Sequence, residues 1–290
     1  MSTSISSEYI GPYRLLKVAN TGQTSRLWQA YDDENRQYVA IKTLQEKYVH
    51  DNVHIAYLKK EYEVAAGLDH QYLIKILKFG IEKRIPYLAM EWCAAPNLKM
   101  ILNRGYMQIA PYYQQIVPHM IEGLAYLHSK GWIHRDIKPD NFIFTEDADV
   151  KLIDFALATK KPSGLSKLFS FGSRKSQGTA SYMSPEQIKG ETATEQSDIY
   201  SFGCTLFELL ATRSPYSGGS MNELLQKHIS GIVPPVTARN NNLTPEIAEI
   251  VKSCLAKNPK DRPKNSTDLA QILKSTRIFK RPPKNSDVNV

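Results

Sequence analysis

The segment His134-Arg135-Asp136-Ile137-Lys138-Pro139-Asp140-Asn141 decides how the rest of the chain is interpreted. It places an aspartate, a lysine and an asparagine within the six residues from Asp136 to Asn141. An aspartate can orient or accept a proton, a lysine can offset negative charge, and an asparagine oxygen is a hard ligand that suits magnesium. Phosphoryl transfer needs these groups, because the protein mainly positions the acceptor and stabilises charge. The segment thus contains the residue types that phosphoryl transfer would need, although any one of them alone would indicate nothing.

Three residues elsewhere in the chain supply the remaining charges that such a site requires. Lys42 ends the β-prone run Val39-Ala40-Ile41-Lys42, and Glu61 lies on a predicted helix at an interval that lets it reach Lys42. Asp154, in Asp154-Phe155-Ala156, follows another β-prone run, at a suitable interval after Asn141 for a metal-binding carboxylate.

In order and spacing, these segments resemble the motifs of eukaryotic-type (Hanks-type) serine/threonine protein kinases, and their wording resembles the bacterial members of that family. The resemblance extends over residues 13–273, nearly the whole chain. The later motifs of the family match Gly178-Thr179, Ser184-Pro185-Glu186, Asp198-Ile199-Tyr200-Ser201-Phe202-Gly203 and Asp261-Arg262-Pro263.

The resemblance implies an α+β, bilobal protein-kinase-like fold, with a small antiparallel β-sheet lobe that contains one helix and a larger, mainly α-helical lobe. The sequence pattern agrees, because β-rich runs alternate with turns in the first third and helical periodicity dominates from Pro96 onward. Asp51 is placed to cap the single helix of the first lobe. The β-rich runs are Tyr13 to Val18, Arg26 to Tyr31, Tyr38 to Thr43, Ile74 to Phe79 and Tyr87 to Glu91.

These patterns predict the following domain organisation. An N-terminal segment (1–12) precedes a kinase domain (13–276), which divides into an N-lobe (13–91), a hinge (92–95) and a C-lobe (96–276). The segment 277–290 is basic, contains Pro282 and Pro283 and has little apolar content, which predicts a disordered tail.

The resemblance assigns a role to each catalytic residue. Asp136 would accept or orient the proton of the acceptor hydroxyl, and Lys138 would offset charge on the transferring phosphoryl group. Asn141 and Asp154 would be the magnesium ligands. Lys42 would bind the α- and β-phosphates of ATP and would be held by an ion pair with Glu61.

The resemblance also implies an adenine pocket. Leu27 and Ala40 would cover one face of the base and Ile143 the other, while the backbone near Glu91 and Cys93 would bond its edge. Met90 would guard the back of the pocket, and Gly22 would belong to the phosphate-binding loop.

Three charged residues are assigned structural roles by the same resemblance. Glu186 and Arg262 would form an ion pair, and Asp198 would cap a buried helix while bracing the catalytic loop. Lys138 together with Thr179, positioned to hydrogen-bond Asp136 and Lys138, predicts a preference for serine or threonine acceptors over tyrosine.

Two departures from the family pattern leave an alternative open. The glycine-rich loop aligns with Asn20-Thr21-Gly22-Gln23-Thr24-Ser25-Arg26-Leu27, so only one of its glycines is present, and D-F-G is replaced by Asp154-Phe155-Ala156. A stiffer or imperfect phosphate lid is expected. The alternative is a pseudokinase, a nucleotide-binding signalling scaffold with little turnover. A small-molecule phosphotransferase is a further alternative, but it leaves Thr179 and Arg262 without a purpose.

The stretch between Asp154 and Glu186 predicts regulation by phosphorylation. It contains no acidic residue between those two, and five cations are interleaved with serines. A phosphate would relieve this repulsion, and Arg135 is the residue type with which related kinases capture it. We expect autophosphorylation within residues 163–179, with Ser173 or Ser176 favoured and with self-association as a possible route, while Thr179 is expected to be structural.

The amino-acid composition limits the partners and the cellular compartment that can be expected. The 37 Lys and Arg against 29 Asp and Glu give a net charge of +8, but the excess is concentrated in one loop and the tail, so no nucleic-acid partner is expected. Three widely spaced cysteines indicate neither a disulfide framework nor a zinc site and favour the cytoplasm. We expect no membrane segment in this chain. The expected partners are protein substrates with serine or threonine acceptors, and the expected cofactors are ATP and Mg²⁺.

Overall fold

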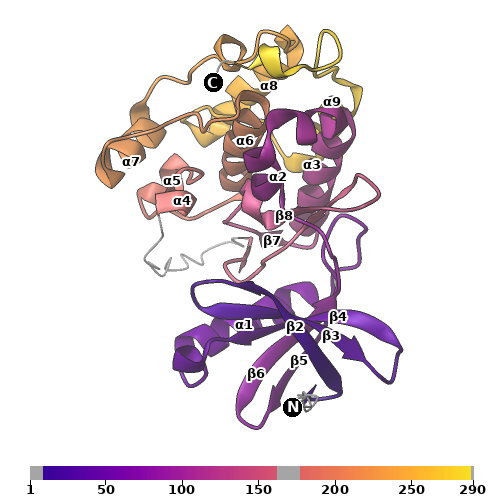
Figure 1. The fold of residues 1–290 in the computed structure, drawn as a ribbon. Coiled ribbons are helices and arrows are strands. Elements are labelled where there is room, and N and C mark those ends of the chain that lie inside the picture. The colour runs from indigo at the N-terminus through magenta and orange to yellow at the C-terminus, as the bar shows by residue number, and fades with distance from the viewer. Residues whose placement is uncertain (1–8, 162–176, 289–290) are drawn as a thin grey trace. The chain divides into compact units, whose positions relative to one another are not determined.

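The computed structural model describes residues 9–161 and 177–288, which belong to two compact units (Figure 1). The first unit comprises Met1–Ala94 together with Asp154–Leu157, and the second comprises Ala95–Ile153 together with Ala158–Val290. An antiparallel sheet dominates the first unit and helices dominate the second, so the predicted α+β class is confirmed.

The first unit is built on a six-stranded antiparallel sheet with the order β1-β2-β3-β4-β6-β5. Its buried side packs around Ala30, Val39, Ile41 and Ala89. The five β-rich runs correspond to β2 through β6, but the run expected from Ile74 begins later and continues further, into a hairpin with β6. The strands are β1 (Tyr9–Ile10), β2 (Tyr13–Thr21), β3 (Ser25–Asp32), β4 (Gln37–Leu44), β5 (Ile76–Glu82) and β6 (Ile85–Glu91).

One α-helix, α1 (Asn52–Ala65), interrupts this sheet between β4 and β5. The Asp51 side chain accepts hydrogen bonds from the backbone N–H groups of Val53 and His54, which confirms the predicted N-cap. The buried face of α1 includes Leu58 and Glu61. The same helical spacing that buries the apolar residues therefore turns the Glu61 carboxylate inward.

The second unit is organised around α6 (Glu195–Ala211), which is buried from Ser197 to its end. Gly203 allows α8 to approach closely, because a Cβ atom at Gly203 would lie 2.7 Å from Cys254 Cβ. The other α-helices are α2 (Leu98–Arg104), α3 (Tyr113–Ser129), α4 (Gln177–Ala180), α5 (Pro185–Ile188), α7 (Met221–Ser230), α8 (Pro245–Cys254) and α9 (Ser266–Ser275).

Short strands and 3₁₀ helices complete the fold. Antiparallel pairs join β7 to β10 and β8 to β9. These strands are β7 (Trp132–Ile133), β8 (Phe142–Phe144), β9 (Val150–Leu152) and β10 (Thr159–Lys160). The 3₁₀ helices are η1 (Glu46–Tyr48), η2 (Tyr106–Gln108), η3 (Ala110–Tyr112), η4 (Pro139–Asn141), η5 (Val236–Ala238), η6 (Pro259–Asp261) and η7 (Asn285–Asp287).

The C-terminal segment differs from the predicted disordered tail. Ile278 and Phe279 are buried, and Asp287 is 1% exposed. The Asp287 carboxylate pairs with Arg281 and accepts a hydrogen bond from Asn242 Nδ2 at 2.9 Å. The expectation of disorder through residue 288 is therefore wrong, because a few apolar and paired polar groups are enough to hold the segment against the second unit.

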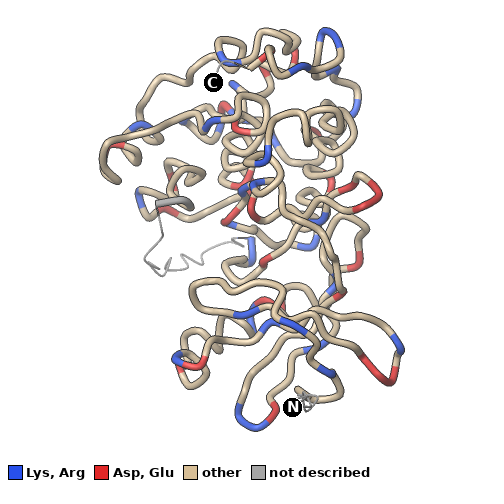
Figure 2. The backbone as a smooth tube through the Cα atoms, in the orientation of Figure 1, with Lys and Arg blue, Asp and Glu red and all other residues tan. Residues whose placement is uncertain are grey.

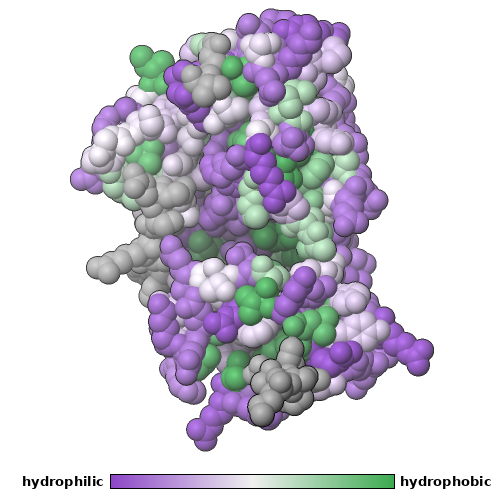
Figure 3. Space-filling model, in the orientation of Figure 1, coloured by the Kyte–Doolittle hydropathy of each residue, from purple (hydrophilic) through white to green (hydrophobic). Residues whose placement is uncertain are grey.

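Charge and hydropathy are distributed as expected for a water-exposed surface. Lys and Arg alternate with Asp and Glu along the backbone of both units (Figure 2). On the face seen in Figure 3, hydrophilic side chains cover most of the surface. Among the described residues, no helix combines the length and apolar character needed to cross a membrane.

Candidate active site

Lys42 forms the centre of a charged cluster in the first unit. Its Nζ lies 2.7 Å from Glu61 Oε2 and 3.7 Å from Asp154 Oδ1. Strand β4 carries the lysine and α1 the glutamate, so the predicted ion pair between strand and helix is present. Burial lowers the pKa of Lys42, but the carboxylates of Asp154 and Glu61 outweigh this effect and raise the pKa overall. The ammonium is therefore cationic at neutral pH.

In the two unusual motifs of the first unit, the residues that replace the family's glycines do not need a positive φ. In the Asp154-Phe155-Ala156 motif, the residue with a positive φ (66°) is Asp154, whereas Ala156 does not have a positive φ. The glycine-rich loop is a turn in which Gly22 N–H donates to Ser25 O at 2.9 Å, and the Gln45 side chain donates to Gly22 O. Neither Asn20 nor Ser25 requires a positive φ here, so the absent glycines leave no strained residue behind.

The catalytic-loop residues meet in the second unit. Lys138 Nζ donates to Asp136 Oδ2 at 2.7 Å and to Thr179 Oγ1 at 3.2 Å. Asn141 Nδ2 donates to Asp136 O at 2.7 Å and to Asp136 Oδ2 at 3.1 Å. These bonds fix one carboxylate oxygen of Asp136, and no described residue donates a hydrogen bond to Asp136 Oδ1. A hydroxyl group could therefore donate to Oδ1.

Asp198 holds this loop from the buried helix α6. Its Oδ2 accepts from His134 N–H and its Oδ1 from Arg135 N–H, both at 2.7 Å. The expected bracing of the loop is therefore present. The expected cap is wrong, because the N-cap residue of α6 is Thr194 and Asp198 lies inside the first turn, where its side chain serves the loop instead.

His128, at the end of α3, was missed by the sequence analysis. Its Nε2 lies 2.8 Å from Asp198 Oδ2, and its Nδ1 lies 2.8 Å from Ser266 Oγ and 3.1 Å from Glu195 Oε1. Burial lowers the pKa of His128, but hydrogen bonds to Asp198 and Glu195 raise it overall. The sequence contained a signal, because the helical spacing from Ile121 and Leu124 places His128 on the buried face of α3.

Arg262 and Glu186 form the predicted ion pair. Arg262 Nη1 lies 2.7 Å from Glu186 Oε1, and Nη2 lies 3.0 Å from Oε2. Arg262 also donates to the carbonyl oxygens of Ala256, Gln196 and Lys257. Burial raises the pKa of Glu186, but the guanidinium outweighs it and the pKa is lowered. The pair ties the segment after Thr179 to the helical core.

The residues assigned to adenine binding occupy defined strand positions in their own units. In the first unit, Ala40 lies opposite Met90 in the β4–β6 pair, and both side chains are buried. Leu27 in β3 lies opposite Lys42, and Glu91, the last residue of β6, donates its N–H to Lys75 O. Cys93 follows, partly buried and outside any disulfide. In the second unit, Ile143 lies in β8 opposite Lys151.

Part of the phosphorylation hypothesis lies outside the described residues. Ser173 and Ser176 lie outside the described residues, whereas the Thr179 hydroxyl contacts Lys138 as predicted. The stretch begins beside the catalytic loop, where β10 pairs with β7 and Lys160 Nζ lies 3.9 Å from the centre of the Trp132 ring. Arg135 has a positive φ of 70°, and Gln187 Nε2 donates to its carbonyl oxygen at 3.0 Å.

The two proposed metal ligands are suited to magnesium. Both side-chain hydrogen bonds that Asn141 makes with described residues are donated through Nδ2, so its Oδ1 is available as a neutral oxygen ligand. The Asp154 side chain is 40% exposed and offers a carboxylate. Within the described ranges, no three His, Cys, Asp or Glu side chains gather as a metal site. Each residue therefore provides, within its own unit, an oxygen donor of the kind that magnesium prefers.

A model of the protein kinase domain matches residues 13–276. The chain therefore belongs to the protein kinase family, and the recognition of a Hanks-type kinase from its motifs is confirmed.

The chain is similar to several bacterial members of that family. It is 31% identical to the serine/threonine-protein kinase PrkC of Bacillus subtilis (strain 168), over 91% of this chain and 40% of PrkC. It is 32% identical to the serine/threonine-protein kinase PknL of Mycobacterium tuberculosis (strain CDC 1551 / Oshkosh), over 85% of this chain and 60% of PknL. The chain thus spans only about half the length of these curated relatives.

Proposed function

We propose that this chain transfers the γ-phosphate of Mg·ATP to serine or threonine hydroxyls of proteins. The observation that carries the proposal is the contact of Lys138 with both Asp136 and Thr179. It leaves Asp136 Oδ1 open for the acceptor hydroxyl and places a cation beside it. The names of the bacterial relatives support the choice of serine and threonine.

The chemistry follows from these contacts. The acceptor hydroxyl donates to Asp136 Oδ1, which orients the oxygen for in-line attack and takes the proton as the new O–P bond forms, while the bond between the γ-phosphorus and the β,γ-bridging oxygen breaks and ADP leaves. Lys138 stabilises negative charge on the phosphoryl oxygens during transfer. Asn141 and Asp154 would hold magnesium, which would neutralise charge on the phosphates. Lys42, kept cationic by Glu61 and Asp154, binds the α- and β-phosphates.

The test is the variant Asp136→Asn, assayed with radiolabelled ATP and a generic basic protein, followed by phosphoamino-acid analysis. We expect phosphoserine and phosphothreonine with the wild type and a loss of turnover of at least ~100-fold in the variant. ATP binding should be nearly unchanged, because Asp136 acts on the acceptor. Wild-type protein that binds ATP but transfers no phosphate would favour the pseudokinase alternative.

We further propose autophosphorylation within residues 163–179, with Ser173 or Ser176 preferred. Its support is the basic composition of that stretch and the position of Arg135 next to Asp136. Mass spectrometry after incubation with Mg·ATP locates the sites. Activity of the wild type and of Arg135→Ala is then compared before and after phosphatase treatment. Absence of phosphate from this stretch would contradict the proposal.

A further inference from the structure

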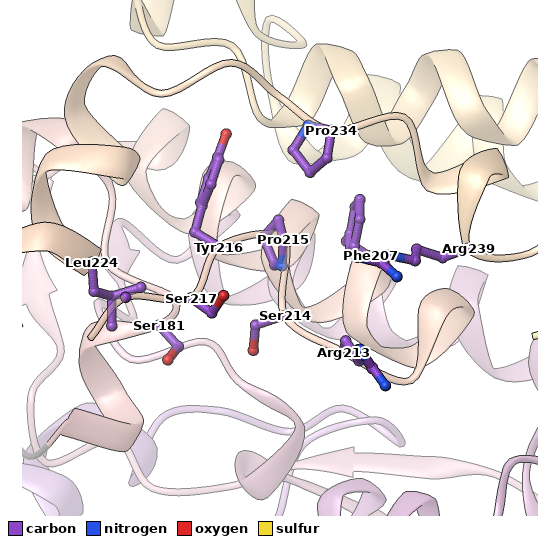
Figure 4. Close-up of a pocket in the computed structure, with 11 residues that line it drawn as sticks. Ser181, Phe207, Arg213, Ser214, Pro215, Tyr216, Ser217, Leu224, Pro234 and Arg239 are labelled. Carbon is purple, nitrogen blue, oxygen red and sulfur yellow. The ribbon is translucent and has the colours of Figure 1, made fainter. Parts of the chain in front are cut away.

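A cavity of about 510 Å³ lies in the second unit, between the end of α6, the beginning of α7 and the stretch before η5 (Figure 4). Its lining includes the serines Ser181, Ser214 and Ser217; in this view Ser181 and Ser217 lie toward Leu224, and Ser214 lies between them and Arg213. The arginines Arg213 and Arg239 lie on the side of Phe207. The cavity therefore combines hydroxyl groups, two cations and an apolar wall.

The charge of this cavity is uncompensated. None of its lining residues is acidic, and no described residue forms an ion pair or a side-chain hydrogen bond with Arg213 or Arg239. The neighbouring acidic groups already have partners, because Glu223 pairs with Lys227 and Glu208 pairs with Lys99. Both arginine side chains are exposed and can reach a bound anion.

The walls of the cavity are held in place by the surrounding core. Tyr216 packs with Ala180 and Leu224, and its hydroxyl lies 2.8 Å from Lys257 Nζ. The carbonyl oxygen of Tyr182, next to Ser181, accepts a hydrogen bond from Ser201 Oγ at 2.7 Å. Such fixed walls favour binding, because the side chains have little conformational freedom left to lose when a ligand binds.

The turn that carries Arg213 is strained. Thr212 ends α6 in the left-handed conformation, with a φ of 60°, which is unusual for a β-branched residue. Strain of this kind persists where the surrounding structure imposes it and is common at binding sites.

The cavity begins close to the candidate catalytic residues. Ser181, on its lining, follows Thr179 by two residues, and Thr179 Oγ1 contacts Lys138 at 3.2 Å. Two extended residues span at most about 7 Å. A peptide whose hydroxyl reaches Asp136 can therefore place a side chain a few residues away into the cavity.

We propose that this cavity binds a glutamate or aspartate side chain of the protein substrate, a few residues from the phosphorylated hydroxyl. The carboxylate pairs with Arg213 and Arg239 and accepts hydrogen bonds from the serine hydroxyls, while its methylene groups contact the apolar wall. The cavity thus selects protein substrates that carry an acidic residue a few positions from the serine or threonine that is phosphorylated. The proposal rests on the proposed kinase function, because it names the substrates of that activity.

The test uses serine peptides in which each position from three before to three after the acceptor carries either Glu or Gln. We expect Glu at one or more positions to lower KM by about five- to thirtyfold relative to Gln, since each of two exposed ion pairs contributes up to about fivefold. The double variant Arg213→Ala/Arg239→Ala should lose this preference at unchanged kcat. Arg104→Ala, which removes another exposed arginine of the same unit, should keep it.

A charge-reversed variant separates recognition from loss of folding. Arg213→Glu/Arg239→Glu should prefer Lys over Gln at the position where the wild type prefers Glu, a gain that a damaged fold cannot produce. Equal KM values for the Glu and Gln peptides at every position in the wild type would overturn the proposal. So would a Glu preference that survives in the double alanine variant.

A binding measurement distinguishes failure of this proposal from failure of the proposed function. If the wild type phosphorylates no peptide, the kinase proposal fails, and the cavity is then tested by fluorescence anisotropy of a labelled Glu peptide on Asp136→Asn protein. Binding that is lost when Arg213→Ala/Arg239→Ala is added supports the cavity as an acidic-peptide site. Equal binding with and without the two arginines overturns it.

Discussion

Lys42 and Asp154 are neighbours in the first unit, but we propose that they contribute differently to nucleotide binding. The side chain of Lys42 is 19% exposed and lies 2.7 Å from Glu61, whereas the side chain of Asp154 is 40% exposed and lies 3.7 Å from the lysine. The short contact with Glu61 fixes the lysine, and the more exposed carboxylate of Asp154 is the group that we propose binds a metal ion.

This difference predicts two distinct defects. Asp154→Asn should weaken ATP binding in the presence of magnesium and should abolish its magnesium dependence, because a neutral amide is a poorer ligand than a carboxylate. Lys42→Met should lower turnover more than affinity. Titration of ATP into each variant, with and without magnesium, measures both effects. Asp154→Asn protein with the magnesium dependence of the wild type would contradict the metal-binding role.

At the scale of elements, the N-terminal turn of α6 connects the catalytic loop to α3. Asp198 accepts two backbone N–H groups of the loop, and His128 lies between Asp198 and Glu195. Lys161 Nζ lies 3.4 Å from the other oxygen of Glu195. Hydrogen bonding to His128 is the main cause that lowers the pKa of Glu195 to about 2. The imidazolium therefore compensates two carboxylates at the point where the loop is held.

His128→Gln should make stability depend less on pH. Because the pKa of His128 is raised in the folded protein, its stabilisation is complete below the unfolded value of 6.5 and is lost as the pH rises through the folded value. Glu195 remains ionised throughout this range. Removing the cation from this buried site should cost about 3 kcal/mol at pH 6 and less at pH 9.

Thermal unfolding of the wild type and of His128→Gln between pH 6 and pH 9 measures this effect. His50→Gln, at an exposed position, serves as the control and should change stability little. A difference between wild type and His128→Gln that stays constant across the pH range would refute the role of the imidazolium.

The sequence predicted strands and helix caps well where a short local pattern determines them. The strands β2 to β6 and the Asp51 cap follow from alternation and capping chemistry, and the partners of Lys42 and Arg262 follow from the resemblance of the motifs to the kinase family. The partners of His128, the Gln45 contact with Gly22 and the cavity of Arg213 and Arg239 could not be predicted in this way. Each brings together residues from separate elements, so their proximity depends on packing that no short pattern encodes.

At the scale of the whole molecule, the C-terminal segment is part of the second unit. Asp287 pairs with Arg281 and accepts a hydrogen bond from Asn242, and Thr244 Oγ1 donates to Arg277 O at 2.5 Å. Composition predicted disorder here because most residues of the segment are polar. The burial of Ile278 and Phe279 outweighs that tendency.

Asp287→Ala should therefore destabilise the second unit, by about 2 kcal/mol, because it removes the partner of Arg281 and leaves Asn242 Nδ2 with one bond fewer. Ser286→Ala, at the adjacent exposed position, should be neutral within about 0.5 kcal/mol. Denaturant unfolding of the three proteins gives the comparison. Equal midpoints would indicate that the segment contributes nothing to stability.

The close packing at Gly203 has a practical consequence for labelling the protein. It buries Cys204 and Cys254 completely, and burial raises the pKa of both thiols, that of Cys254 to about 12. Neither can form a reactive thiolate at neutral pH. A maleimide dye should therefore attach only to the partly exposed Cys93 of the native chain, and to all three cysteines in denaturant, as intact-mass spectrometry would show. The wild-type sequence thus provides a single attachment point for a fluorophore next to the residues proposed to bind adenine.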